Sequence, residues 1–265
     1  MEGLFLKKHV LDREVIYVHM NQTDHFVLSY GIRFIDFLTG IPNQIQNALL
    51  IRHKIKDSHF NMHTRLEYVD QEMIEKLVQE DIRGYGEFCW IDFHDEEHLN
   101  LLSGQEIAEI LYLGHLKDHL RLPFYRKLKN NFAYLAGEDG WFNKTYYKEW
   151  DSFFSMLGST IVGKINNQKE KSFFFKVKKK SVPAIPKEIL HPFADFMKEG
   201  MVISLERVNR NRLTIEIPVW VIGDFFDMDV MYEEYEMLGD RKADGKLVFD
   251  RKSGEWQAFA AYSTT

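Results

Sequence analysis

The sequence predicts an α+β protein, with a helix-rich N-terminal part around a central strand and then a smaller, mostly antiparallel β unit with one helix. Three patterns lead to this prediction. Residues 88–93 form an apolar strand that leads into a capped helix. A long helical pattern covers 146–165, and after the wholly polar residues 166–171 the alternation typical of strands takes over. We expect a helix-rich α/β domain at 1–167 and an antiparallel α+β domain at 168–265, which could also pack as one continuous unit.

The composition is that of a globular protein with a sizeable core. The chain has 265 residues, is 45% hydrophobic and carries a formal net charge of −6. This negative balance weighs against nucleic acid or an anionic membrane as a general partner. Because the sequence has no secretory signal pattern and no apolar run long enough to span a bilayer, we expect a cytoplasmic protein without a membrane partner. The single cysteine, Cys89, lies in an apolar strand pattern and should be a buried side chain rather than a reactive thiol.

The first part should begin with a strand and continue with short helices. Residues 15–18 are β-branched or aromatic, which is typical of a strand. The pattern at 26–38 fits neither a helix nor a strand well, and both assignments stay open. A short helix is expected at 45–52, and an amphipathic surface helix at 66–82, where Ile74, Leu77 and Val78 lie on one face.

The strand at 88–93 and the helix after it form the best defined unit of the sequence. The strand is apolar on both faces until Asp92, which is typical of a central strand covered on both sides. Burying a carboxylate without partners is costly, so Asp92 should lie at an exposed strand end or be held by hydrogen bonds or a cation. Ser103 and Glu106 form a capping box that begins the helix, and Pro123 ends it.

The second part should consist mainly of antiparallel strands. We expect a strand at 173–177, a helix at 186–198 and a hairpin between 203 and 217. A further meander is expected from 232 onward. Seven carboxylates lie between Asp224 and Asp240, in a spacing that does not match an EF-hand. They predict a solvated acidic loop that could pair with a basic segment of the chain or with a basic partner.

Residues 94–98 match the pattern H-x-x-E-H, in which two histidines bind zinc and a glutamate acts as base. Imidazoles four residues apart share one face of a helix, and a carboxylate can complete an open tetrahedral site. The pattern directly follows a strand, however, and the helical pattern begins only after Ser103. A metal-dependent hydrolase at 92–98, with a divalent metal and with Asp92 and Glu97 as candidate catalytic residues, is therefore an alternative rather than our main hypothesis. The candidate metal ligands are His94, Asp95, His98, His115 and His119.

His115 and His119 lie on one stripe of the helix that follows Ser103. His115 lies about 18 Å along this helix from its start, which argues against one site shared with residues 94–98. We favour the interpretation that both histidines are hydrogen-bonded or partly exposed near the C-terminal end of the helix.

Residues 169–180 combine lysines with three consecutive phenylalanines. Such a strand could bind single-stranded nucleic acid, with cations along the backbone and rings under the bases. An edge strand whose lysines prevent pairing with other sheets is the interpretation we favour. The candidate nucleic-acid contacts are Lys176, Lys178, Lys179 and Lys180.

The sequence contains no intact Walker A loop, dinucleotide-binding glycine motif, nucleophile elbow or C-x-x-C pair. Charge asymmetry and many aromatic residues are typical of partner surfaces. We therefore expect a binding or regulatory protein without catalysis, which acts through a protein partner, through self-association or through a small ligand. Metal-dependent hydrolysis and single-stranded nucleic-acid binding are the two alternatives.

Overall fold

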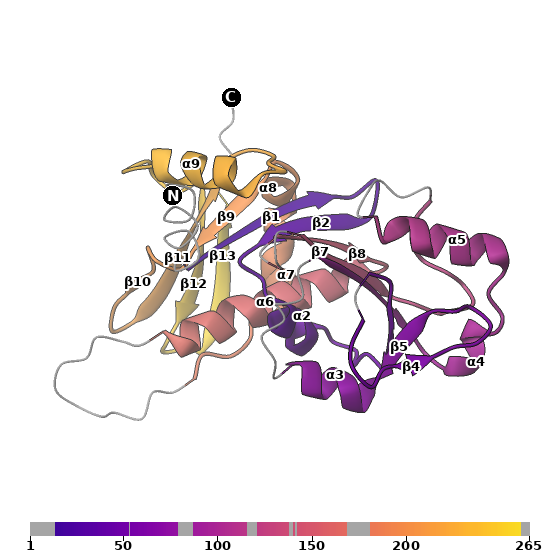
Figure 1. The fold of residues 1–265 in the computed structure, drawn as a ribbon. Coiled ribbons are helices and arrows are strands. Elements are labelled where there is room, and N and C mark those ends of the chain that lie inside the picture. The colour runs from indigo at the N-terminus through magenta and orange to yellow at the C-terminus, as the bar shows by residue number, and fades with distance from the viewer. Residues whose placement is uncertain are drawn as a thin grey trace. The chain divides into compact units, whose positions relative to one another are not determined.

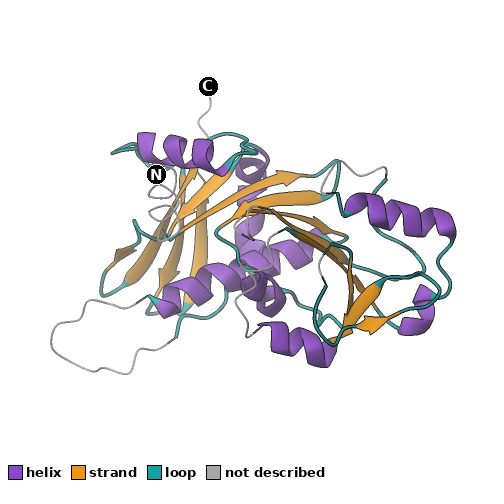
Figure 2. Ribbon diagram, viewed as in Figure 1, coloured by secondary structure: helices purple, strands orange, loops and turns teal. Residues whose placement is uncertain are grey.

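The computed structural model describes residues 14–52, 54–78, 87–115, 121–137, 140, 142–168 and 181–260 (Figures 1 and 2). Within these ranges it contains thirteen strands, joined by helices that are mostly short. The expectation of a helix-rich first part with a small β unit is therefore wrong, because antiparallel strands dominate both parts of the chain.

Contacts divide the chain into two compact units. The middle unit is Met20–Phe153, and the terminal unit combines Met1–His19 with Phe154–Thr265. The expected domain boundary between residues 167 and 168 stays a prediction.

In the middle unit the strand order is β2-β8-β7-β6-β3-β5-β4. The strands are β2 (Phe26–Tyr30), β3 (Asn47–Leu50), β4 (His59–Phe60), β5 (Glu67–Asp70), β6 (Phe88–Phe93), β7 (Phe132–Gly137) and β8 (Phe142–Tyr147). The helices are α2 (Phe34–Gly40), α3 (Gln71–Val78), α4 (Glu96–Leu99) and α5 (Gly104–Leu113). The predicted central strand is confirmed, since β6 pairs with β3 on one side and with β7 on the other.

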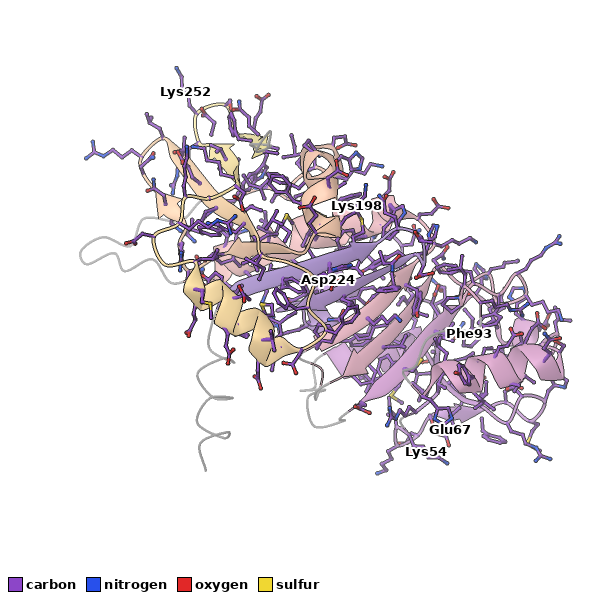
Figure 3. The ribbon with its side chains drawn as sticks, turned by 90° about the horizontal axis from the view of Figure 1, so that it is seen from above. Lys54, Glu67, Phe93, Lys198, Asp224 and Lys252 are labelled. Carbon is purple, nitrogen blue, oxygen red and sulfur yellow. The ribbon has the colours of Figure 1, made fainter. Side chains whose placement is uncertain are left out.

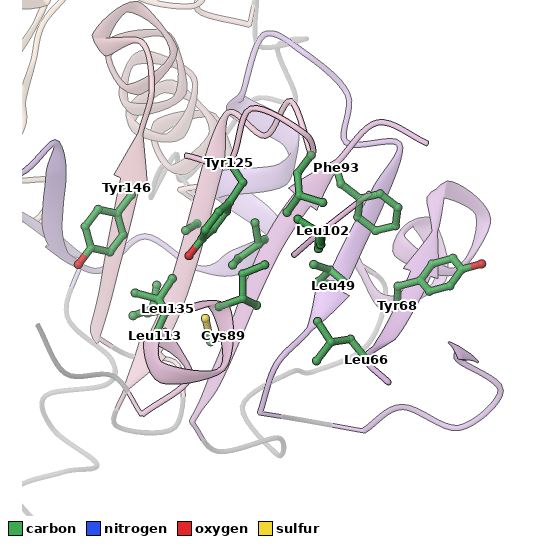
Figure 4. Close-up of a cluster of buried hydrophobic side chains, with 14 of the residues drawn as sticks. Leu49, Leu66, Tyr68, Cys89, Phe93, Leu102, Leu113, Tyr125, Leu135 and Tyr146 are labelled. Carbon is green, nitrogen blue, oxygen red and sulfur yellow. The ribbon is translucent and has the colours of Figure 1, made fainter. Parts of the chain in front are cut away.

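Strand β6 is buried on both faces. On one face Cys89 and Ile91 belong to a cluster that includes Leu113 of α5 (Figure 4). On the other face the ring of Trp90 meets Phe34 of α2 edge to face, with 4.6 Å between ring centroids. Cys89 is fully buried, as expected, and burial raises the pKa of its thiol.

Sheet pairing decides the elements that the sequence pattern left open or predicted wrongly. The ambiguous segment 26–38 holds both strand β2 and most of helix α2. The helix expected at 45–52 is instead strand β3, which pairs with β5 and β6 along its two edges. Four residues are too few for their periodicity to separate a strand from a helix, so the backbone hydrogen bonds of two neighbouring strands decide the outcome.

Helix α5 begins where the capping box predicts. The Ser103 side chain accepts the backbone N–H of Glu106 at 3.3 Å, and the Glu106 carboxylate accepts the backbone N–H of Ser103 at 2.7 Å. The two bonds satisfy two donors that the first turn would otherwise leave free. Helix α3 confirms the amphipathic pattern within 66–82, although residues 67–70 are strand β5 and residues 79–82 lie outside the described residues.

In the terminal unit the strand order is β13-β12-β11-β9-β1, with β10 beside β11. The strands are β1 (Val15–Asn21, of which Val15–His19 belongs to this unit), β9 (Met201–Ser204), β10 (Asn209–Arg210), β11 (Thr214–Val221), β12 (Gly245–Asp250) and β13 (Glu255–Ala260). The helices are α6 (Trp150–Asn167, which begins in the middle unit), α7 (Lys187–Leu190), the 3-10 helix His191–Phe193, α8 (Ala194–Lys198) and α9 (Met228–Met237).

The strands of the terminal unit confirm most of the antiparallel pattern predicted from the sequence. Strands β9 and β11 pair antiparallel, and β12 and β13 form a hairpin that turns at Gly254. The expected helix at 186–198 is present as three short helical pieces. The meander expected from 232 onward is wrong in its first part, because residues up to Met237 belong to helix α9. The expected strand at 173–177 lies outside the described residues.

A close approach of two backbone segments holds the terminal unit together near the end of α8. Gly200 has a φ of +83°, and a Cβ atom placed on it would lie only 1.7 Å from the carbonyl oxygen of Gly223. A side chain is therefore excluded here for two reasons, the backbone conformation and the lack of space. Gly254 has a similar φ of +78°, but nothing lies within 4 Å of the Cβ position.

These two glycines form a matched pair for a stability test. We expect Gly254→Ala to cost about 1–2 kcal/mol, the price of a left-handed conformation alone. Gly200→Ala should cost about 1–3 kcal/mol more, since the backbone around Gly223 must also move. Urea denaturation followed by tryptophan fluorescence measures both free energies of unfolding. Equal losses of unfolding free energy in the Gly254→Ala and Gly200→Ala variants would contradict the close approach at Gly200.

Candidate functional site

Asp92 is held by hydrogen bonds, which is one of the outcomes expected from the sequence. Its carboxylate accepts the backbone N–H groups of Asn131 at 3.0 Å and Phe132 at 2.6 Å, where strand β7 begins. Burial raises the pKa of Asp92 to about 6, and the hydrogen bonds from Asn131 and Phe132 offset only part of this effect. The carboxylate therefore fastens the end of β6 to the start of β7.

The candidate metal ligands after β6 lie on an exposed turn and on the short helix α4. His94 Nδ1 is 2.7 Å from a carboxylate oxygen of Asp95, and His98 Nδ1 is 3.9 Å from the same oxygen. Glu97 is exposed. Among the described residues, no group of three or more His, Cys, Asp or Glu side chains is arranged to hold a metal ion. The hydrolase alternative thus lacks a three-ligand site in the part of the chain that the structure describes.

The remaining predicted site residues do not join this cluster. His115 is exposed just after α5, where its ring lies 6.4 Å from that of Tyr112. None of its described contacts is with His94 or His98. His119 and the lysine candidates Lys176, Lys178, Lys179 and Lys180 lie outside the described residues.

The acidic segment that the sequence predicts as a loop is largely the helix α9 (Figure 1). Its N-cap is Asp227, whose carboxylate accepts the backbone N–H groups of Asp229 at 2.9 Å and Val230 at 3.2 Å. This cap replaces hydrogen bonds that the first turn of a helix lacks. The helix buries one face, formed by Met228, Met231, Tyr232 and Tyr235.

The opposite face of α9 exposes apolar side chains. Phe226, Val230 and Met237, which we call the α9 stripe, are 68%, 45% and 74% exposed. At 100° per residue, the spacing of seven places Val230 and Met237 within about 20° of one another on α9. Phe226 lies in the loop just before the N-cap Asp227. Exposed carboxylates surround the stripe, namely Asp227, Asp229, Glu233, Glu236 and Asp240. The sequence has no lysine or arginine from residue 213 to residue 240, so the charged side chains of this segment are all carboxylates.

The loop before α9 is fixed to strand β1 by the hydroxyl group of Tyr17. This hydroxyl donates to the carbonyl oxygen of Gly223 at 3.1 Å and accepts the backbone N–H of Phe225 at 2.9 Å. Asp224, which lies between these two contacts, is labelled in Figure 3. The loop that leads into α9 is therefore hydrogen-bonded to Tyr17 on both sides of Asp224.

The helix itself and its C-terminal end are fixed by two further residues. Arg207 donates to the carbonyl oxygen of Gly239 at 2.8 Å, and its guanidinium lies 5.2 Å from the ring centroids of both Trp220 and Tyr235. The hydroxyl group of Tyr235 is 2.7 Å from that of Ser204 on β9. The α9 stripe is consequently part of a rigid element rather than of a loose acidic loop.

Sequence reasoning recognised the carboxylates of this segment but missed the stripe. The sequence did contain a signal for the stripe, because Val230 and Met237 follow helical spacing. The buried residues of α9 occupy the positions on the opposite face of the same helix. The density of carboxylates concealed it, since Asp and Glu are also typical of loops.

Two further findings bear on function. In the described ranges, none of the helices combines the length and the apolar character needed to traverse a lipid bilayer. Comparison of the chain with protein-family models, with curated proteins and with solved structures finds no match. A function is therefore assigned from the chemistry of the protein surface alone.

The raised pKa of Asp92 leads to a prediction about pH. The folded state holds this proton more tightly than the unfolded state does, where the pKa is about 3.9. The stability that the protonated Asp92 carboxyl group gives to the folded state is therefore complete below about pH 4. It is lost as pH rises through the folded pKa of about 6. Asp92→Asn removes the titrating group, so the stability of the native protein relative to this variant should fall between pH 4 and pH 7, as urea denaturation at both pH values can measure. If the unfolding free energy of the native protein minus that of Asp92→Asn stays constant or grows with pH, the raised pKa is contradicted.

Proposed function

We propose that the protein is a binding or regulatory protein, without catalysis, that binds a basic amphipathic segment of a protein partner through α9. The observation that carries the proposal is the α9 stripe, whose three exposed apolar side chains lie among carboxylates with no cation nearby in sequence. Exposed apolar side chains rimmed by polar groups are typical of an interaction site.

Each part of this surface has a distinct role in binding. Phe226 and Met237 are long side chains whose burial removes apolar surface from water, worth about 1.5–3 kcal/mol for each side chain that becomes fully buried. The surrounding carboxylates attract lysine and arginine side chains, raise the association rate and exclude acidic partners. A helix with apolar residues on one face and lysines beside them complements both features.

A second copy of the chain fits this surface less well than a basic partner does. In a twofold symmetric dimer the same patch contacts itself. The carboxylates beside Val230, such as Glu233 and Asp229, would then face carboxylates of the other copy across the interface, and like charges placed together are repulsive. The charge of the surface thus favours a different molecule of opposite charge.

A labelled synthetic helix of leucine and lysine, with leucines on one face, tests the proposal by fluorescence anisotropy. We expect binding that weakens as salt is added, and an acidic leucine and glutamate helix should not bind. Met237→Ser should raise the dissociation constant about tenfold, because it removes an apolar anchor worth roughly 1–2 kcal/mol. Met62→Ser is the matched control, since Met62 is 81% exposed and lies in the middle unit.

The charges are tested in the same way. Glu233→Lys should weaken binding and reduce its salt dependence, whereas Glu149→Lys, which makes the same change at an exposed position before α6, should leave both unchanged. Equal affinities for the Met237 and Met62 variants, or equal binding of acidic and basic helices, would overturn the proposal. Concentration-dependent dimerisation that Met237→Ser abolishes would assign the surface to self-association instead and would also overturn it.

A further inference from the structure

A second surface of the terminal unit has the opposite electrostatic character. A groove of about 680 Å³ lies on strands β11, β12 and β13 and on the segments around Arg207 and Lys242. Its volume falls within the range of about 300–1,000 Å³ that is usual for small-molecule sites.

The floor of the groove is a row of side chains across three strands. Pro218 of β11 is paired in register with Lys246 of β12, and Lys246 is paired with Phe259 of β13. Cross-strand partners point to the same side of a sheet, so the three side chains share one face. Phe259 is 48% exposed, and its ring is flanked by Lys246, whose Nζ lies 5.7 Å from the ring centroid. The floor therefore offers the apolar surfaces of Pro218 and Phe259 with Lys246 between them.

Within the described ranges, two cations that line this groove have no carboxylate partner. Of the two carboxylates that line the groove, Glu216 accepts a hydrogen bond from Lys246 at 2.9 Å, and Asp244 accepts one from Arg241 at 2.8 Å. Among the described residues, neither Arg207 nor Lys242 pairs with a carboxylate. Arg207 donates one of its five N–H groups to Gly239 and is held against aromatic rings, so its remaining donors are available in a fixed orientation.

The geometry points to a binding site for a small aromatic anion, such as an aryl carboxylate, sulfonate or phosphate. The ring of the ligand lies on Phe259, and its anionic group is bound by Arg207 and Lys242. A fixed guanidinium favours such oxygen anions because its parallel N–H groups match two oxygens. The site shares neither its apolar floor nor its unpaired cations with the α9 stripe, so the two proposals can fail separately.

The fluorescent dye anilinonaphthalene sulfonate, which joins aromatic rings to one sulfonate, is a direct probe. We expect saturable binding, with the dissociation constant raised about tenfold by Lys242→Glu through loss of a charge-assisted contact. Lys252→Glu is the matched control, because Lys252 is exposed in the β12–β13 turn and does not line the groove (Figure 3). It should bind the dye as the native protein does.

The apolar floor is tested by Phe259→Ser, expected to raise the dissociation constant by a similar factor, against Phe60→Ser. Phe60 is 51% exposed on β4 in the middle unit, so its loss should leave dye binding unchanged. Circular dichroism and urea midpoints establish that each variant is folded. If Phe259→Ser fails to fold, Lys242→Glu at its exposed position still decides the outcome.

Three results would overturn this inference. The first is equal dye affinity in the Lys242 and Lys252 variants. The second is equal or tighter binding of phenylnaphthylamine, which has the rings of the dye without the sulfonate. The third is loss of the dye signal in Met237→Ser, which would place the dye on the α9 stripe instead.

Discussion

The hydroxyl group of Tyr17 is the contact on which the terminal unit's exposed surface depends. It satisfies both the carbonyl of Gly223 and the N–H of Phe225, and thereby sets the path of the chain into α9. Like an ordinary tyrosine, Tyr17 keeps its hydroxyl proton at neutral pH and so remains a donor, and burial raises its pKa further, to about 12. Leaving either backbone group unpaired costs about 1–3 kcal/mol if it stays buried. The absence of a side chain at Gly200 is part of the same arrangement, because Gly223 occupies that space.

The terminal unit carries two surfaces of opposite charge. The α9 stripe combines apolar side chains with carboxylates, while the groove on β11, β12 and β13 combines Phe259 with two cations that have no carboxylate partner among the described residues. Arg207 belongs to both environments, since it packs against Tyr235 under α9 and also lines the groove. Neither surface resembles the site expected after β6, where Asp92 bonds to backbone groups, His94 lies on an exposed turn and His98 lies on α4.

The parts of the fold that could be predicted are those whose signals are local. Strand β6, the capping box at Ser103 and the β12–β13 hairpin are each determined by a few adjacent residues, and all three are present. Strands of two or four residues, such as β4 and β3, carry too little periodicity and form because neighbouring strands pair with them. That dependence explains why a sheet-dominated protein was expected to be helix-rich. The same holds for the candidate site. Its carboxylates could be seen in the sequence, but the hydrogen bond from Tyr17 to Gly223 joins positions 206 residues apart and has no local signal.

The most direct test of the account is amide hydrogen exchange in Tyr17→Phe, which removes only the hydroxyl group. The account predicts that the amide of Phe225 exchanges at least about tenfold faster, as expected for a loss of roughly 1.4 kcal/mol in the local opening free energy. Amides at the start of α9, such as that of Met231, should follow, while those of the β12–β13 hairpin, such as that of Leu247, should keep their native rates. Unchanged exchange at Phe225, or equal acceleration throughout the terminal unit, would contradict the claim that this hydroxyl specifically holds the α9 surface in place.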